Sequence, residues 1–315
     1  MASLSLMRLA VIDLGTNTFN LLVVEINGKE FTPVFNTKRA VKIGEGALIA
    51  GKLLPEPINR GKATLAEYQG IISKHKCDKT FAFATSGIRS TSNGQNFVDE
   101  VKSEIGLDIN IIDGEEEAQL IYDGVDLAIP FSETPSVVMD IGGGSTEFII
   151  ADNSGVLWKK SYKLGISRIL QMLEPANPVS QTDLESLNKL LATELVELVA
   201  KCKGLGIKTL VGSSGSFDSF AEMLWAQKGV KKTTKEIVSD EFDLNEVSQL
   251  HTQLISSDWK TRSQIPGLVE MRVDTIHMAS YFVQWVLENC GLERLLLSTY
   301  ALKEGVVHRV MEDRL

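Results

Sequence analysis

The chain has 315 residues, of which 43% are hydrophobic and 23% are charged, and its formal net charge is −9. This length suffices for two domains or one large one with a buried core, and the composition is that of an ordinary globular protein. An acidic protein binds duplex nucleic acid poorly, because affinity for its phosphates comes mainly from Lys and Arg. A polyanionic ligand would therefore need a local basic patch, backbone amides or a metal ion.

The N-terminal run and the cysteines predict a cytoplasmic protein. The run MASLSLMRLAVIDLG is short and leads into a glycine turn, which is typical of a first strand rather than a signal peptide. No stretch approaches the roughly 18 apolar residues of a membrane helix, so we expect no membrane partner. Cys77, Cys202 and Cys290 are too few and too widely spaced for a disulfide framework or a zinc site.

Strands and helices alternate in the first half of the chain. Residues 9–12 and 19–26 are apolar runs on either side of a short polar turn, which predicts a β-hairpin. After it we expect a helix over about 57–74, a strand at 80–84, a helix after residue 93, a strand at 108–112 and a helix from 115. This alternation predicts a layered α/β fold.

The second half opens with another predicted hairpin, whose strands at 136–139 and 148–151 flank a glycine turn. Leucines at helical spacing predict a helix over 183–203. Further patterns predict a strand at 208–211, a helix at 273–287, a strand at 294–297 and a closing helix at 302–311. The segment around Pro175 is expected to be a loop, and the charged stretch 228–243 a solvated surface excursion.

The two hairpins repeat each other. VIDLGTNTFNLLVVE and VMDIGGGSTEFIIAD each place an aspartate at the end of a β-run, a glycine two residues later and hydroxyl residues in the turn. A repeat over so long a period indicates two related domains. We expect the first over residues 1–125, completed by the last helix at about 300–315, and the second over 126–299.

Three glycine- and hydroxyl-rich turns follow strands and can aim backbone N–H groups at phosphate. They comprise Gly15, Thr16, Asn17 and Thr18; Gly142, Gly143, Gly144, Ser145 and Thr146; and Gly212, Ser213, Ser214 and Gly215. Paired turns of this kind suit a substrate with several phosphates in a row. Asp13 and Asp140, at the strand ends, can hold Mg²⁺ (or Mn²⁺) beside phosphate oxygens, or can simply cap their own turns.

The turns resemble the two phosphate motifs of the exopolyphosphatase/guanosine pentaphosphate phosphohydrolase (Ppx/GppA) family. The resemblance continues in order along the chain. Residues 84–93 resemble the family's ATSA-x-R-x-A-x-N segment, residues 114–124 its G-x-EEA-x-LIY-x-G segment, and residues 212–216, 267–274 and 303–305 later motifs. The resemblance implies an α/β fold of two ribonuclease H-like domains, of the actin-like ATPase superfamily, with an interdomain cleft.

The resemblance also implies roles for individual residues. Glu116, the first glutamate of the EEA motif, would be the general base, and Glu147 would lie beside the metal and the attacking water. Without the resemblance, the acidic run 115–117 would indicate only a helix start, where carboxylates favour the positive end of the helix dipole. Arg89 resembles the family's phosphate-binding arginine, and Lys42 and Arg272 are further candidates for phosphate contacts.

The chain also departs from the family pattern. Gln119, Lys42 and Lys303 stand where arginine is common, which weakens the cationic surface, since lysine cannot form the bidentate phosphate fork. Gly87 stands where alanine is usual, a change expected to have no consequence. Long family members continue into a helical region that resembles HD-type hydrolases, so this chain resembles the short, two-domain form.

The resemblance, together with these patterns, implies release of terminal phosphate from inorganic polyphosphate, conversion of pppGpp to ppGpp, or both. Two alternatives stay open. Paired phosphate turns alone do not exclude an ATP-dependent small-molecule kinase of the same superfamily, and the replaced arginines suggest a non-catalytic sensor that binds polyphosphate or guanosine polyphosphates. The resemblance also implies a homodimer.

Overall fold

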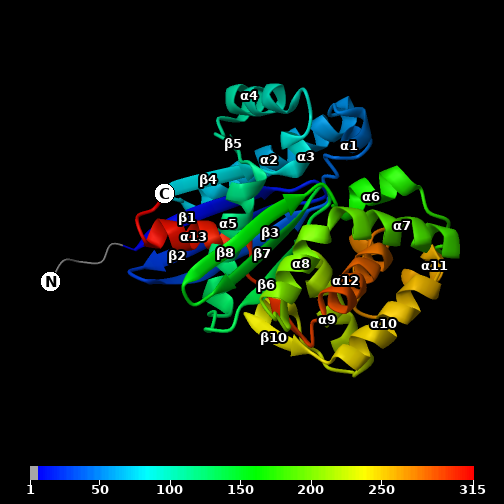
Figure 1. The fold of residues 1–315 in the computed structure, drawn as a ribbon. Helices are drawn as coiled ribbons and strands as arrows, with labels where there is room; N and C mark the ends of the chain where they lie inside the picture. Colours follow the sequence, from blue (N-terminus) through cyan, green and yellow to red (C-terminus); the bar gives the residue numbers. More distant parts are fainter. Residues whose placement is uncertain (1–5) are drawn as a thin grey trace. The chain divides into compact units, whose positions relative to one another are not determined.

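The computed structural model describes residues 6–315, which form two α/β units (Figure 1). The first unit comprises Met1–Leu127, Gly142–Gly144 and Leu302–Leu315, and the second comprises Ala128–Ile141 and Ser145–Ala301. The first five residues of the predicted N-terminal run lie outside the described residues. No helix within 6–315 is long and apolar enough to cross a membrane.

The first unit is built on a five-stranded sheet with the order β3-β2-β1-β4-β5. β1, β2 and β3 form an antiparallel meander, and β4 and β5 continue the sheet in parallel to β1. The strands are β1 (Met7–Leu14), β2 (Phe19–Asn27), β3 (Glu30–Arg39), β4 (Lys79–Ala84) and β5 (Asn110–Ile111). The helices are α1 (Ala47–Ala50), α2 (Pro55–His75), α3 (Ser86–Arg89), α4 (Gly94–Ile105), α5 (Gly114–Ala128) and α13 (Leu302–Met311).

The second unit repeats this sheet and adds one strand, with the order β10-β11-β9-β6-β7-β8. β6, β7 and β8 form the meander, β9 and β11 run parallel to each other and to β6, and β10 pairs antiparallel with β11. The strands are β6 (Ser136–Ile141), β7 (Thr146–Asp152), β8 (Gly155–Tyr162), β9 (Thr209–Ser213), β10 (Ser239–Phe242) and β11 (Arg294–Ser298). This shared order is that of ribonuclease H-like domains, so the predicted fold class is confirmed.

The helices of the second unit surround one apolar helix, α12 (Ile276–Cys290), which is buried along most of its length. α12 contacts α6 (Ile166–Leu173), α7 (Gln181–Glu194), α8 (Val196–Gly204), α9 (Gly215–Gln227) and α10 (Leu244–Ser256). The short α11 (Trp259–Arg262) follows α10 in the chain. A helix that buries apolar side chains along most of its length is stable only with neighbours on several sides.

Each unit has its own hydrophobic core. In the first, Phe19, Leu65 and Phe97 are fully buried, and the buried Tyr68 hydroxyl donates to the Phe19 carbonyl oxygen at 2.8 Å. In the second, Phe148 and Phe282 pack edge to face with ring centroids 6.2 Å apart. The strands that carry the predicted turns, β1 and β6, are therefore anchored in rigid cores.

Several predicted elements differ in the structure. The helix predicted over 183–203 is two helices, because the backbone leaves helical geometry at Leu195, between α7 and α8. The stretch 228–243 is not only a solvated excursion, since it contains β10, which pairs with β11. The helix predicted from 273 begins at Ile276, and the strand predicted at 108–112 is limited to two residues.

Candidate functional site

The Gly15 turn joins β1 to β2 and is closed by its own backbone. The Gly15 N–H donates to the Thr18 carbonyl oxygen at 3.0 Å, and a Cβ at Gly15 would lie 3.0 Å from that same oxygen. The Asp13 carboxylate accepts a hydrogen bond from the Asn20 side-chain amide at 2.9 Å. The turn is therefore fixed at both of its ends before any ligand binds.

The segment that contains Lys42 pairs with the same turn through its backbone. Lys42 N–H donates to the Asn17 carbonyl oxygen at 2.8 Å, and Gly44 N–H donates to the Thr16 carbonyl oxygen at 3.1 Å. Lys42 has a φ of 50°, and its side chain is exposed. The structure thus places Lys42, predicted as a phosphate contact, beside the first turn.

The segment after β4 also lies against the first turn, because β4 is the parallel neighbour of β1. The Thr85 N–H and the Thr85 hydroxyl both donate to the Leu14 carbonyl oxygen, at 3.3 and 3.4 Å. Gly87 comes so close that a Cβ there would lie 2.8 Å from the Thr16 Cα. The expectation that glycine at 87 has no consequence is wrong, because this close backbone approach leaves no room for a methyl group.

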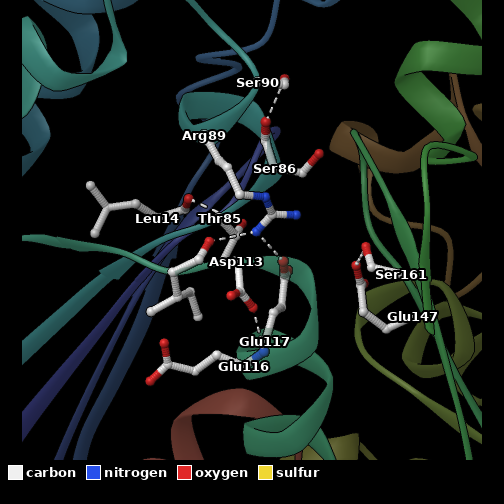
Figure 2. A network of polar contacts seen from close by, with 11 residues as sticks. Leu14, Thr85, Ser86, Arg89, Ser90, Asp113, Glu116, Glu117, Glu147 and Ser161 are labelled. Atoms are coloured by element: carbon white, nitrogen blue, oxygen red, sulfur yellow. Dashed lines mark hydrogen bonds and ion pairs between the residues drawn. The ribbon is translucent and has the colours of Figure 1, made fainter. Parts of the chain in front are cut away.

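Arg89 and the beginning of α5 form one polar cluster (Figure 2). Arg89 Nη1 donates to the Ile112 carbonyl oxygen and to Glu117 Oε2, each at 2.8 Å. The Asp113 carboxylate accepts the Glu116 N–H at 2.8 Å and so caps the first turn of α5. The three consecutive glutamates separate, because Glu117 is buried whereas Glu115 and Glu116 are exposed.

The second glycine turn groups with the first unit. A Cβ at Gly143 would lie 2.9 Å from the Asn17 amide nitrogen and from the Thr16 Cβ, and one at Gly144 would lie 2.7 Å from the Ser86 hydroxyl. These approaches explain why the run is glycine, since any side chain there would displace its neighbours. Gly143 and Gly144, both predicted for phosphate binding, thus lie against Thr16, Asn17 and Ser86.

Four polar residues form a row across four strands of the second unit's sheet. Asp140 on β6 lies directly opposite Glu147 on β7 and beside Ser213 on β9, and Glu147 lies opposite Ser161 on β8. The Ser213 hydroxyl donates to Asp140 Oδ2 at 2.8 Å, and the Ser161 hydroxyl donates to Glu147 Oε1 at 2.7 Å. Directly opposed residues share one face of a sheet, so both carboxylates are on the same side.

This row brings two buried carboxylates to opposed positions on neighbouring strands. Asp140 is 7% exposed and Glu147 is 1% exposed. Carboxylate oxygens are the ligands that a hard cation such as Mg²⁺ prefers. Within residues 6–315, no group of three or more His, Cys, Asp and Glu side chains is placed to hold a metal. Asp13, the other predicted ligand, belongs to the first unit.

The third glycine turn leads from β9 into α9. Ser214 has a φ of 68°, and its hydroxyl donates to the Ile141 carbonyl oxygen at 3.3 Å. The Arg272 guanidinium fills the space beside Gly215, because a Cβ there would lie 2.1 Å from its Nη2 atom. Burial lowers the pKa of Arg272, and the charges of Asp218 and Asp140 oppose that shift. Arg272, predicted as a phosphate contact, therefore packs against the third turn.

Two other predicted contacts are mainly structural. The Ser145 side chain is buried, and the Thr146 hydroxyl donates to the Leu164 carbonyl oxygen at 3.0 Å. Lys303 Nζ lies 3.8 Å from the buried Glu304 carboxylate. The replacement of arginine by Gln119 also has a local partner, since its amide donates to Asp123 Oδ1 at 3.3 Å.

Sequence reasoning missed Asn20, Ser161 and Glu117. Asn20 and Ser161 hold the carboxylates of Asp13 and Glu147, and Glu117 holds Arg89. The internal repeat contained a signal for Asn20, because Asn20 follows Asp13 at the same distance in the sequence as Glu147 follows Asp140. Ser161 required knowledge of the pairing register of β7 and β8, which composition does not give.

Comparison with known proteins shows the family of the chain. The model of the Ppx/GppA phosphatase family matches residues 22–314. The chain belongs to the Ppx/GppA phosphatase family. The crystal structure of an exopolyphosphatase from Cytophaga hutchinsonii is 34% identical, with a TM-score of 0.94 and coverage of 98% of both chains.

Curated relatives within the family carry two kinds of name. Exopolyphosphatase 1 of Mycobacterium leprae is 25% identical over 98% of this chain and 90% of its own length. A guanosine-5'-triphosphate,3'-diphosphate pyrophosphatase of Aeromonas hydrophila is 26% identical over 96% of this chain. The chain spans only 59% of the length of that pyrophosphatase.

Proposed function

We propose that this Ppx/GppA member is a phosphohydrolase that releases terminal orthophosphate from inorganic polyphosphate, from pppGpp, or from both. The observation that carries the proposal is the polar cluster at the beginning of α5. There Glu116 is an exposed carboxylate in the first turn of α5, and Glu117 in the same turn accepts a hydrogen bond from Nη1 of Arg89. The names of the relatives support the choice of substrates.

In this proposal Glu116 orients the attacking water and accepts its proton. The water oxygen attacks the terminal phosphorus, and the bond to the bridging oxygen breaks to release orthophosphate. Arg89 and the backbone amides of the first two glycine turns hold the charged phosphate oxygens. Such positioning and charge stabilisation supply most of the catalysis in phosphoryl transfer.

The proposal includes a divalent cation, Mg²⁺ or Mn²⁺. Asp140 and Glu147 are the residues of the second unit that would hold it, and when bound it would neutralise charge on the phosphate oxygens. Ser161 and Ser213 keep the two carboxylates of the second unit in place. We further infer a cytoplasmic homodimer that binds neither duplex nucleic acid nor membranes.

The test is release of inorganic phosphate in the presence of Mg²⁺ from tripolyphosphate, long-chain polyphosphate, pppGpp and ATP. Glu116→Gln is expected to lower kcat by about 10²–10⁴-fold, the usual contribution of a general base. Glu115→Gln is the matched control, because Glu115 is its exposed neighbour on the same helix turn.

Equal activity of the two variants would show that the base is another residue. No phosphate release from any substrate, together with binding of the same compounds in calorimetry, would reject the hydrolase proposal and favour a non-catalytic sensor. Transfer of phosphate from ATP to an added small molecule would instead identify a kinase.

A further inference from the structure

Glu117 is a buried carboxylate for which the proposed reaction has no use. Its side chain is 10% exposed, although it follows two exposed glutamates in the first turn of α5. Burying a carboxylate costs free energy unless the group is paired. Here the pairing is with Arg89, whose Nη1 lies 2.8 Å from Glu117 Oε2. The cost of this burial calls for a function of the pair.

The arginine is held by one nitrogen only. Nη1 donates both to Glu117 and to the Ile112 carbonyl oxygen. Within residues 6–315, Nε and Nη2 donate to no acceptor, and in Figure 2 both dashed lines of the guanidinium start at Nη1. The Nε and Nη2 hydrogens form an edge that matches two oxygens of one phosphate.

The two acceptors of Nη1 are themselves fixed. The Ile112 N–H donates to the Ala84 carbonyl oxygen at 3.1 Å, which ties that residue to β4. Glu117 is anchored by the first turn of α5, where its N–H donates to the Asp113 carbonyl oxygen at 3.0 Å. An arginine side chain has several rotatable bonds, so two rigid acceptors on one nitrogen remove most of its freedom. The guanidinium plane is therefore set before a ligand arrives.

We propose that Glu117 is a positioning residue that turns the Nε–Nη2 edge of Arg89 toward a substrate phosphate. The inference rests on the proposed function, in which Arg89 contacts that phosphate. It divides the acidic run between two tasks, because Glu116 acts on water while Glu117 acts through Arg89. Misplacing a group that binds the reacting phosphate lowers kcat/KM even when the base is intact.

A double-mutant cycle tests this role with tripolyphosphate as the substrate. Glu117→Ala is expected to lower kcat/KM by about 10²-fold, the scale of a positioning defect. Glu117→Gln keeps an acceptor oxygen of the same shape but loses the charge, so a loss of about tenfold is expected. Glu115→Gln should behave as wild type, and thermal melting should confirm that each variant is folded.

The decisive measurement is the pair of variants Arg89→Ala and Arg89→Ala/Glu117→Ala. If Glu117 acts through Arg89, removing it from the Arg89→Ala protein has little further effect on kcat/KM. Losses that simply multiply would overturn the proposal and leave Glu117 a structural residue. If Glu117→Ala does not fold, the same cycle is run with Glu117→Gln.

Failure of this inference is distinct from failure of the proposed function. Suppose that the wild type hydrolyses tripolyphosphate, that Arg89→Ala is impaired and that Glu117→Ala is as active as the wild type. This result would contradict only the positioning role of Glu117. Wild type without activity would contradict the proposed hydrolysis. In that case the double-mutant cycle is measured with the dissociation constant of tripolyphosphate, determined by calorimetry for the same four proteins. Losses of binding free energy that add up in the double variant would again reject the role of Glu117.

Discussion

At the scale of single residues, the repeat places a polar residue opposite each aspartate but changes its chemistry. Asp13 lies opposite Asn20, and Asp140 lies opposite Glu147. An amide can donate to the aspartate, as Asn20 does, whereas a carboxylate adds a second negative charge. The pair of Asp140 and Glu147 is therefore the stronger candidate for binding a cation. Ser161 and Ser213 donate hydrogen bonds to these two carboxylates from the neighbouring strands.

Ser161→Ala tests how much its hydroxyl stabilises the buried Glu147 carboxylate. A hydrogen bond to a charged group contributes about 1.5–3 kcal/mol, so the free energy of unfolding should fall by about that amount. Urea unfolding measures the change. Ser186→Ala is the control, because the Ser186 hydroxyl is exposed and bonds only within its own helix. An equal change in both variants would mean that the Glu147 contact has no special weight.

Gly87→Ala is expected to reduce activity and stability together. The added Cβ would lie 2.8 Å from the Thr16 Cα, so the first glycine turn or α3 must shift. Overpacking of this kind costs about 1–3 kcal/mol, which thermal melting would detect. Gly70→Ala is the control, because a Cβ at Gly70, in the middle of α2, meets nothing within 4 Å. That variant should gain about 0.5–1 kcal/mol from its higher helix propensity, and a Gly87→Ala protein that behaved likewise would contradict the steric argument.

The sequence was sufficient to select most of the candidate residues but not their partners. Glycine, hydroxyl and aspartate residues after a β-run are visible as a local pattern, so Gly15, Asp13 and Asp140 could be chosen. The partner of Arg89 is Glu117, which is 28 residues away in the chain. Such a contact depends on how β4 and α5 pack, and one sequence carries no record of that packing.

At the scale of elements, strands with fully apolar runs were predictable and half-exposed strands were not. β1 and β6 are buried along most of their length, whereas β3 and β10 are largely exposed or half-buried. β10 has the sequence SDEF, whose charges resemble a surface loop. Polar edge strands are common because they discourage pairing with other chains, and this hides them from a search for apolar periodicity.

Gly305→Ala tests the close packing of α13 on α5. A Cβ at Gly305 would lie 1.8 Å from the Leu120 carbonyl oxygen, so the two helices must move apart. We expect a loss of about 3 kcal/mol or more in unfolding free energy, at the upper end of overpacking costs. Because α5 carries Glu116 and Glu117, phosphate release should also fall.

Chemical denaturation and phosphate release of Gly305→Ala are compared with those of Gly204→Ala. A Cβ at Gly204, at the end of α8, meets nothing within 4 Å. If both variants unfold at the same denaturant concentration, the approach of α13 to α5 is looser than the structure indicates. The ion pair of Arg309 with Asp123, 2.6 Å apart, joins the same two helices and should be weakened in Gly305→Ala but not in Gly204→Ala.

At the scale of the whole molecule, two cores imply two folding units that spectroscopy can separate. The four tryptophans, at positions 158, 225, 259 and 285, all belong to the second unit. Tryptophan fluorescence therefore follows that unit, whereas circular dichroism follows both. A chain with two cores need not unfold in a single step, so the fluorescence and circular dichroism unfolding curves should each be fitted separately.

The second unit should lose stability as the pH falls, because it buries a neutral histidine. Burial, and then the nearby Arg262 charge, lower the pKa of His277 on α12 to about 4. In the unfolded chain the same group has a pKa of about 6.5. Below that pH the unfolded state binds a proton that the folded state refuses, so stability present above pH 6.5 declines progressively toward pH 4.

Between pH 7.5 and 5.5 this single group should cost about 1 kcal/mol of unfolding free energy. Urea unfolding followed by tryptophan fluorescence at the two pH values measures it. His277→Gln cannot titrate and should remove about that much of the pH dependence, whereas His75→Gln, in the first unit, should leave the fluorescence transition unchanged. An equal pH dependence in wild type and His277→Gln would show that His277 takes up its proton in the folded state, with Asp274, which raises its pKa, outweighing burial and Arg262.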